Sequence, residues 1–215
     1  MCIRPNSNFL IKSSSAFSLI EILLVIGIIG ILATMAIPSL SSITQARGVT
    51  DAGFQVAAAI EQARAEAVSR RTFVWLGIEE DNSNPSKMLR VGMVFSKDGT
   101  SSIATNNLQP IGRALKIDRI SLSTAAVSPD SVNLANFKEG ASFSIGAAKF
   151  DSKRTITFTP MGEVTTNSVP TNADGFTPNI VIPLRSTRGD FQDDNNPVKI
   201  LIDGSVGIPT IKRES

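Results

Sequence analysis

The 215-residue chain contains no histidine and no tyrosine, and its only cysteine is Cys2. Without histidine the chain cannot build a Ser-His-Asp or Cys-His nucleophile system, and most zinc sites are excluded as well. A single cysteine excludes a disulfide within one chain. Carboxylates, lysines and serines remain as possible catalytic groups, but no glycine-rich phosphate loop precedes a helix. We therefore expect neither an enzymatic activity nor a cofactor.

An excess of charge is also lacking. The 21 basic and 19 acidic residues give a net charge of +2, which does not indicate a nucleic-acid-binding protein. The length suits one domain, or one domain with an appendage.

A long apolar run lies close to the N-terminus. Residues 19–37 contain only two polar side chains, those of Glu21 and Thr34. As a helix the run is about 28 Å long, close to the hydrocarbon thickness of a bilayer. The preceding residues 1–16 carry Arg4 and Lys12 and no acid, which favours a cytoplasmic location for that end. The sequence therefore predicts a membrane-spanning helix with the rest of the chain on the outer side.

A cleaved secretory signal peptide is the alternative interpretation of this run. It would be removed after a small residue such as Ala36, leaving a secreted soluble β protein that starts near Ile37. The run is longer than the roughly 7 to 15 apolar residues of a signal peptide, and Pro38 lies just past the expected cut. The run also contains Glu21, and a carboxylate inside a membrane costs about 2.5 to 3.5 kcal/mol on insertion scales. Glu21 is therefore expected to have a functional partner.

Residues 16–21, with the sequence AFSLIE, precede a long apolar helix with Pro38 near its end. This arrangement resembles the class III leader and N-terminal helix of type IV pilins and type II secretion pseudopilins. The resemblance implies that prepilin peptidase cuts between Ala16 and Phe17 and N-methylates Phe17, and that Glu21 is required for efficient assembly. It also implies a single-pass protein of the bacterial inner membrane with a periplasmic head, which later joins a filament of other pilins or pseudopilins. The chain departs from the family at Ala16, where glycine is usual.

The pairing of Glu21 can also be argued from electrostatics. A new amine at Phe17 would lie in the same low-dielectric layer as Glu21, so the amine of a neighbouring subunit can neutralise the carboxylate. Such a pair would set the axial register between adjacent helices, while Gly27 and Gly30 permit close approach. Pro38 removes one backbone hydrogen bond, so we expect a bend or a local loosening of the helix there.

Helical periodicity continues beyond Pro38. An apolar stripe with three- and four-residue spacing runs to about Arg71, formed by Val49, Ala52, Val56, Ile60, Ala63 and Ala67. We expect a transmembrane and assembly helix over 17–38 and its amphipathic continuation over 39–71. Residues 62–70, with the sequence QARAEAVSR, resemble the "ARxEA" stretch that ends the long helix in the GspH/FimT group of minor pseudopilins and minor pilins.

From residue 72 the pattern changes to short β-branched or aromatic runs separated by glycine, proline, asparagine and aspartate. The fold class expected is α+β, with the long N-terminal helix packed on an antiparallel β head over 72–215. The predicted strands are 72–77, 89–95, 113–122, 142–145, 155–159, 179–184, 198–202 and 205–211. The last two are expected to form a hairpin with a two-residue type I′ turn at Asp203 and Gly204.

The head resembles the GspH/FimT group only in part. Residues 156–162 and the segments after residue 179 are similar to the C-terminal half of that head. Residues 79–153 match it poorly and resemble an insertion that varies between members. Some pilin-like proteins of Verrucomicrobial gene cassettes have a similar layout.

An acidic cluster in the head is a weak candidate for a calcium site. Its members offer oxygen ligands but lack the glycine and the terminal glutamate of an EF-hand loop. A solvated loop before the last hairpin is the simpler interpretation, and we therefore predict no metal site. The cluster is formed by Asp190, Asp193 and Asp194 with Asn195 and Asn196.

A second cluster is a possible basic edge. Certain FimT-like minor pilins bind DNA through such residues. Here the density of basic residues is low and acids intervene, so a solvated surface is favoured and nucleic-acid binding is not expected. The basic residues are Arg185, Arg188, Lys212 and Arg213.

These features predict a non-enzymatic structural subunit, either a minor pseudopilin or a minor pilin. The alternative is a filament-tip binding module that contacts DNA or a secreted substrate. A secretion pseudopilus, a pilus and a competence filament all agree with the sequence. Removal of residues 1–16 would lower the basic residues from 21 to 19 against 19 acids and remove Cys2, so packing and strand pairing alone would hold the head.

Overall fold

A computed structural model describes residues 18–81, 87–124, 131–134, 142–150, 154–165, 179–188 and 191–213, with their side chains except those of 33–47, 131–132, 165, 188 and 191–196. The chain divides into two units, with the division between Ile43 and Thr44. Helix α1 (Leu19–Arg70) contributes to both units and is assigned as helical through position 38. All strands belong to the second unit.

The C-terminal end of α1 is closed by the backbone of the next residues. Arg71 adopts a left-handed conformation with φ of 53°. The Arg71 N–H donates to Val68 O at 3.3 Å, and the Thr72 N–H donates to Ala67 O at 3.1 Å. These bonds satisfy carbonyls that the helix end would otherwise leave unpaired, and the left-handed residue turns the chain toward the first strand.

The first sheet has six strands and is antiparallel throughout. Its strands are, in spatial order, β10 (Val164–Thr165), β9 (Thr155–Phe158), β1 (Val74–Asp81), β2 (Met88–Ser96) and β3 (Leu108–Pro110), and β4 (Leu115–Asp118) also pairs with β2.

The second sheet has five strands, and β6 forms its only parallel pair, with β11, among the described residues. The strands lie in the order β13 (Pro209–Arg213), β12 (Phe191–Ile202), β11 (Asn179–Arg188) and β5 (Ile120–Leu122), with β6 (Ser131–Asn133) beside β11. A separate hairpin is formed by β7 (Phe143–Ile145) and β8 (Ala148–Phe150).

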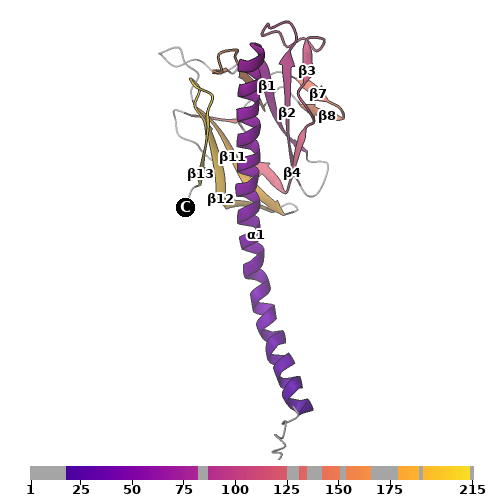
Figure 1. Ribbon diagram of the computed structural model, residues 1–215. Coiled ribbons are helices and arrows are strands. Elements are labelled where there is room, and N and C mark those ends of the chain that lie inside the picture. Colours follow the sequence, from indigo (N-terminus) through magenta and orange to yellow (C-terminus); the bar gives the residue numbers. More distant parts are fainter. Residues whose placement is uncertain are drawn as a thin grey trace, which may run out of the picture. The chain divides into compact units, whose positions relative to one another are not determined.

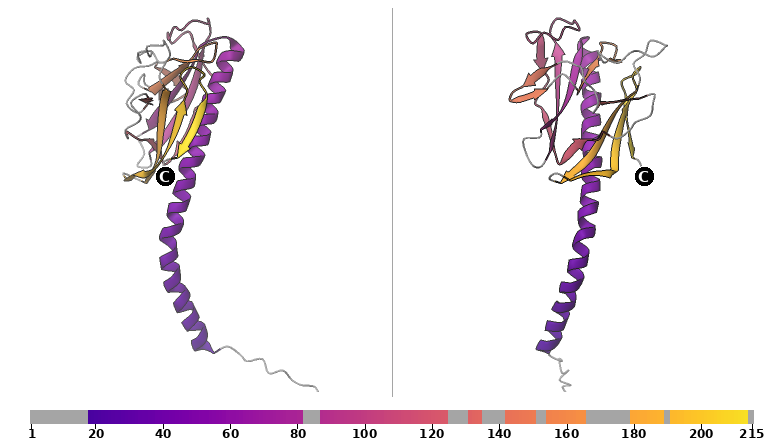
Figure 2. Two further views of the ribbon diagram at one scale, coloured as in Figure 1. Left: turned by 90° about the vertical axis from the view of Figure 1, so that its left-hand side faces the viewer. Right: turned by 180° about the vertical axis from the view of Figure 1, so that it is seen from behind.

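The main core lies between the second half of α1 and the two larger sheets. In Figure 1 this part of α1 runs across the head with β1 and β2 on one side and β12 and β13 on the other, and the views in Figure 2 agree. The α1 side of the core contains the apolar stripe predicted from the sequence, and its members are at most 3 % exposed. Each buried valine or isoleucine side chain of this stripe contributes about 1.5 to 3 kcal/mol, so this face holds α1 on the head.

A second core lies on the opposite face of the six-stranded sheet, under the β7–β8 hairpin. Along β1 the side chains alternate, so that Leu76 enters the main core and Trp75 the second core. Gly77 and Gly92 pair across β1 and β2 and face the stacked rings of Phe143 and Phe150. A Cβ on Gly92 would lie 2.5 Å from Phe150 Cζ, so this pair of glycines makes room for the aromatic hairpin.

One predicted strand is divided in the structure. Residues 113–122 were expected to be continuous, but β4 belongs to the first sheet and β5 to the second. Arg119, between them, has φ of 61°. Its N–H donates to Lys87 O at 2.9 Å and its carbonyl accepts from Thr187 N at 2.8 Å, so one residue turns the chain between the sheets.

The predicted two-residue turn at Asp203 and Gly204 is wrong. Ile202 pairs with Pro209, so residues 203–208 form a six-residue loop between β12 and β13. Asp203 Oδ1 accepts from Ser205 N at 2.8 Å and from Val206 N at 3.2 Å, while Gly207, with φ of 70°, donates to Asp203 O at 2.7 Å. These internal bonds stabilise the wider loop in place of a tight turn.

The prediction of a membrane-spanning helix concerns the first part of α1. Within the described parts of the chain, no helix combines the length and the apolar character that crossing a membrane requires. The side chains of residues 33–47 lie outside these described parts.

Candidate functional site on helix α1

The first part of α1 carries apolar side chains on every side of the helix. Leu19, Ile20 and Leu23 are 78 %, 74 % and 63 % exposed, and the large apolar residues that follow, up to Leu32, are exposed as well. Glu21 is exposed in the first turn of the helix and is the only ionisable residue of 19–32. Its N–H donates to Ser18 O at 3.0 Å. The position suits a carboxylate because the N-terminal end of a helix is electropositive.

The other residues predicted for assembly cannot be placed in the same way. Ala16 and Phe17 lie outside the described residues, and so does the side chain of Pro38. Cleavage, methylation and the bend at Pro38 therefore stay predictions.

The ARxEA stretch places Arg64 beside two loops of the head. Ala63 and Ala67 are fully buried, whereas Arg64 is partly exposed. Arg64 Nε donates to Val206 O at 2.7 Å, which ties α1 to the 203–208 loop. The same side chain lies against Gly162 and Gly207, where a Cβ would come within 3.2 Å of Arg64 Nε and 3.4 Å of Arg64 Cδ respectively.

The two glycines beside Arg64 also hold their loops against each other. A Cβ on Gly207 would lie 2.5 Å from Gly162 O, and both glycines have positive φ. The Val164 N–H donates to Gly204 O at 3.2 Å, which joins the same loops through the backbone. Sequence reasoning missed this arrangement, although Gly162 after Pro160 and Met161, and Gly207 between Val206 and Ile208, were signals of special backbone positions.

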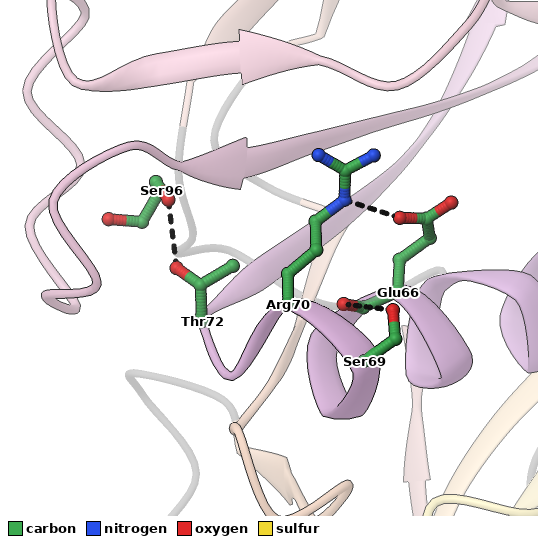
Figure 3. Close-up of polar contacts among 5 residues, drawn as sticks. All are labelled: Glu66, Ser69, Arg70, Thr72 and Ser96. Carbon is green, nitrogen blue, oxygen red and sulfur yellow. Dashed lines mark hydrogen bonds and ion pairs between the residues drawn. The ribbon is translucent and has the colours of Figure 1, made fainter.

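Polar contacts lie within the last turns of α1, and one joins Thr72, just after the helix, to the end of β2 (Figure 3). Arg70 Nε pairs with Glu66 Oε2 at 2.5 Å, and its guanidinium lies 4.5 Å from the centre of the Phe95 ring. Thr72 Oγ1 donates to Ser96 O at 2.8 Å in a buried position. The arginine of the Glu66–Arg70 pair therefore also covers an aromatic ring of β2, as a cation–π contact.

Two exposed aspartates organise loops through hydrogen bonds. The N–H and hydroxyl of Thr100 and the hydroxyl of Ser96 donate to Asp98, and they hold the pKa of its carboxyl well below the usual range. The hydroxyl and N–H of Ser205 lower the pKa of Asp203 in the same way.

Three of the four residues of the possible basic edge have side chains that the structure describes. Arg185 lies on β11, where its Nε donates to Ser121 Oγ at 3.1 Å. Lys212 and Arg213 are exposed on β13, and β12 separates the two strands. The side chain of Arg188 lies outside the described residues.

The loop predicted for the possible calcium ligands is wrong for residues 193–196, which belong to β12, and metal binding by the cluster is untested. Asp190 and the side chains of Asp193 and Asp194 lie outside the described residues. In the described part of the chain no three acidic, histidine or cysteine side chains gather as metal ligands.

Comparison with known protein families matches residues 52–188 to the family described as "Type II transport protein GspH". The matched region starts within α1, contains the ARxEA stretch and ends with β11, so it spans well over half of the chain. Searches of curated proteins and of solved structures gave no match. The chain therefore belongs to the GspH family of minor pseudopilins, within the type IV pilin and pseudopilin superfamily.

Proposed function

We propose that the chain is a structural subunit of a type II secretion pseudopilus and that it assembles through the first part of α1. Membership of the GspH family supports the structural role. The observation that carries the assembly proposal is the exposure of large apolar side chains around the helix from Leu19 to Leu32, with Glu21 alone among them as a charge. Such a surface is stable only in lipid or among other apolar helices.

The proposed sequence of events starts in the inner membrane. Residues 19–37 hold the chain there with its N-terminus in the cytoplasm and its head in the periplasm. Prepilin peptidase cuts between Ala16 and Phe17 and N-methylates Phe17. The Phe17 amine of a neighbouring pseudopilin then neutralises Glu21, because an unpaired carboxylate is costly in an apolar layer.

A filament-tip module that contacts DNA or a secreted substrate was the alternative function. It gains no support from the described head, because Arg185 is bound to Ser121 and is separated by a strand from Lys212 and Arg213. The structural role is therefore the function that we propose.

Substitution of Glu21 tests the assembly step. In Glu21→Ala and Glu21→Gln we expect normal membrane insertion and strongly reduced incorporation into filaments, because both remove the charge that pairs with the amine. Membrane fractionation and immunoblotting of sheared filaments measure the two steps separately. Thr34→Ala removes the other polar side chain of the run and is the matched control, with no loss expected. Normal incorporation of Glu21→Gln would contradict the ion pair.

A further inference from the structure

A groove of about 520 Å³ lies between α1 and the edge of the six-stranded sheet. The buried side chains that line it are Ala59 of α1 and Val91 and Met93 of β2. Gln62 of α1 and Arg113 are exposed on its rim. The groove is therefore apolar inside, with one cation at its edge.

The groove results from a break in the edge of the sheet. β3 and β4 both pair with β2, but β3 ends opposite Val94 and β4 begins opposite Val91. The chain leaves the ladder between them after the Ile111 N–H donates to Met93 O at 2.9 Å, and Gly112 turns it with φ of 68°. This detour leaves the side chains of Val91 and Met93 as lining of an open groove.

The exposed face of α1 beside the groove carries a regular stripe, which we name the α1 stripe. Its spacing alternates between four and three residues, as in a helix that packs on another helix. Phe54 and Val68 are 60 % and 45 % exposed, and Phe54 is the only exposed aromatic side chain in the described parts of the chain. The stripe shares Ala58 with the groove lining. Its members are Phe54, Ala58, Glu61, Ala65 and Val68.

The stripe and the groove carry opposite charges. Glu61 is exposed within the stripe, and Arg113 is exposed on the rim of the groove. Neither has an ion pair or a side-chain hydrogen bond with any residue that the structure describes. Each chain therefore holds one carboxylate and one guanidinium that can pair across a contact between two chains.

We propose that a second copy of this chain packs its α1 stripe into the groove, with Glu61 of one copy beside Arg113 of the other. A helix would cover both the groove and the stripe, whereas a small molecule in the groove would leave Phe54 and Val68 in water. The small side chains of Ala58 and Ala65 permit close approach of the two helices. Glu61 and Arg113 then provide register and specificity.

The two copies can lie side by side with their α1 helices in the same direction. Arg113 and Gln62, which follows Glu61, line the same groove, so Glu61 and Arg113 lie at a similar level along α1. Subunits of one filament require this parallel arrangement. The contact extends the proposed assembly role and does not depend on Glu21.

Cysteine pairs test the contact in the purified full-length chain in detergent micelles. Cys2 is the only native cysteine, so a Cys2→Ser background makes every disulfide assignable. On mild oxidation, a mixture of Glu61→Cys and Arg113→Cys chains should give more disulfide-linked dimer than either chain alone. Glu61→Cys mixed with Lys149→Cys, which places the second thiol on exposed β8, is the control and should give only background. Equal yields from the two mixtures would overturn the proposal.

Charge reversal tests the pairing itself. Glu61→Arg and Arg113→Glu should each weaken dimerisation about tenfold, because like charges would meet at the interface. The double variant Glu61→Arg/Arg113→Glu should restore it, as measured by analytical ultracentrifugation. A double variant as weak as the single ones would contradict the assigned pair.

Crosslinking of Arg113→Cys in whole cells tests which protein occupies the groove. Crosslinks to a different subunit and none to a second copy of this chain would also overturn the proposal.

Analytical ultracentrifugation of Glu21→Ala separates this contact from the assembly role of Glu21. Glu21→Ala should retain the dimer even if its incorporation into filaments is lost. Dimerisation that disappears with Glu21→Ala and is unaffected by Arg113→Glu would place the contact in the first part of α1, against this proposal.

Discussion

At the level of single residues, hydrogen bonds rather than ion pairs stabilise the charged groups of the loops. Asp98 accepts from Ser96, Thr100 and Asn107 while it remains exposed. Its pKa lies below the usual range because these donors favour the ionised carboxylate. The folded state therefore binds a proton at Asp98 more weakly than the unfolded state does.

This difference predicts a pH-dependent contribution of Asp98 to stability. The contribution is complete above the unfolded pKa of about 3.9 and is lost as the pH falls through the lower folded pKa. At neutral pH Asp98→Asn should be less stable than the original chain, and the difference should shrink below about pH 4. Urea unfolding followed by the fluorescence of Trp75, the only tryptophan, measures the difference. Because the other carboxylates titrate in both proteins, a difference that is constant or grows toward low pH would contradict the assignment.

The long-range contact of Arg64 could not be predicted from the sequence, although the helix that carries it could. The ARxEA stretch predicted the family and a helix, and the burial of Ala63 and Ala67 agrees with the apolar stripe. The contact of Arg64 with Val206 joins residues 142 positions apart, and helical periodicity contains no information about such a contact. The role of Arg64 in holding the loops on α1 therefore follows only from the three-dimensional structure.

At the level of elements, the loop between β12 and β13 acts as a docking element for α1. Gly207 has φ of 70°, and a Cβ there would meet Gly162 O at 2.5 Å. Gly99 has a similar φ of 74°, but a Cβ there would have no heavy atom within 4 Å. Both glycines therefore need a left-handed backbone conformation, but only Gly207 is closely packed against another segment.

Alanine substitution at these glycines should separate backbone strain from loop docking. Gly99→Ala is expected to lose about 1 to 2 kcal/mol of unfolding free energy through the left-handed conformation alone. Gly207→Ala should lose about 1 to 3 kcal/mol more, because the added methyl must displace a backbone carbonyl. Urea unfolding with Trp75 fluorescence measures both variants. Equal losses would show that the 203–208 loop does not depend on close contact with the 159–163 turn.

The strand predictions succeeded where local pattern decides the outcome. The run at 89–95 lies in β2 and the run at 155–159 matches β9 up to Phe158, because their apolar side chains alternate or are buried on both faces. The run at 113–122 failed because Arg119 adopts a left-handed conformation that is uncommon for a residue with a Cβ. The turn at Asp203 failed because hydrogen bonds from residues 205–207 to Asp203 close a wider loop. The groove beside α1 was not predictable because it depends on a break between β3 and β4 along the edge of the sheet.

At the level of the whole molecule, the surroundings of α1 differ along its length. In the second unit its buried stripe packs on two sheets, and its other face carries Phe54, Ala58 and Val68 beside a groove. In the first unit its apolar side chains from Leu19 to Leu32 are exposed around the helix. A subunit that assembles through α1 accounts for both surfaces, because each would be covered by lipid or by another subunit.

The N-terminus of the mature chain tests this account most directly. Intact-mass and tandem mass spectrometry of the protein purified from its native membranes would identify the first residue and its modification. The account predicts a chain that begins at Phe17 with an N-methylated amine, because prepilin peptidase performs both steps. A chain that begins near Ile37 would contradict it, since both Glu21 and the exposed apolar segment of α1 would then be absent from the mature protein.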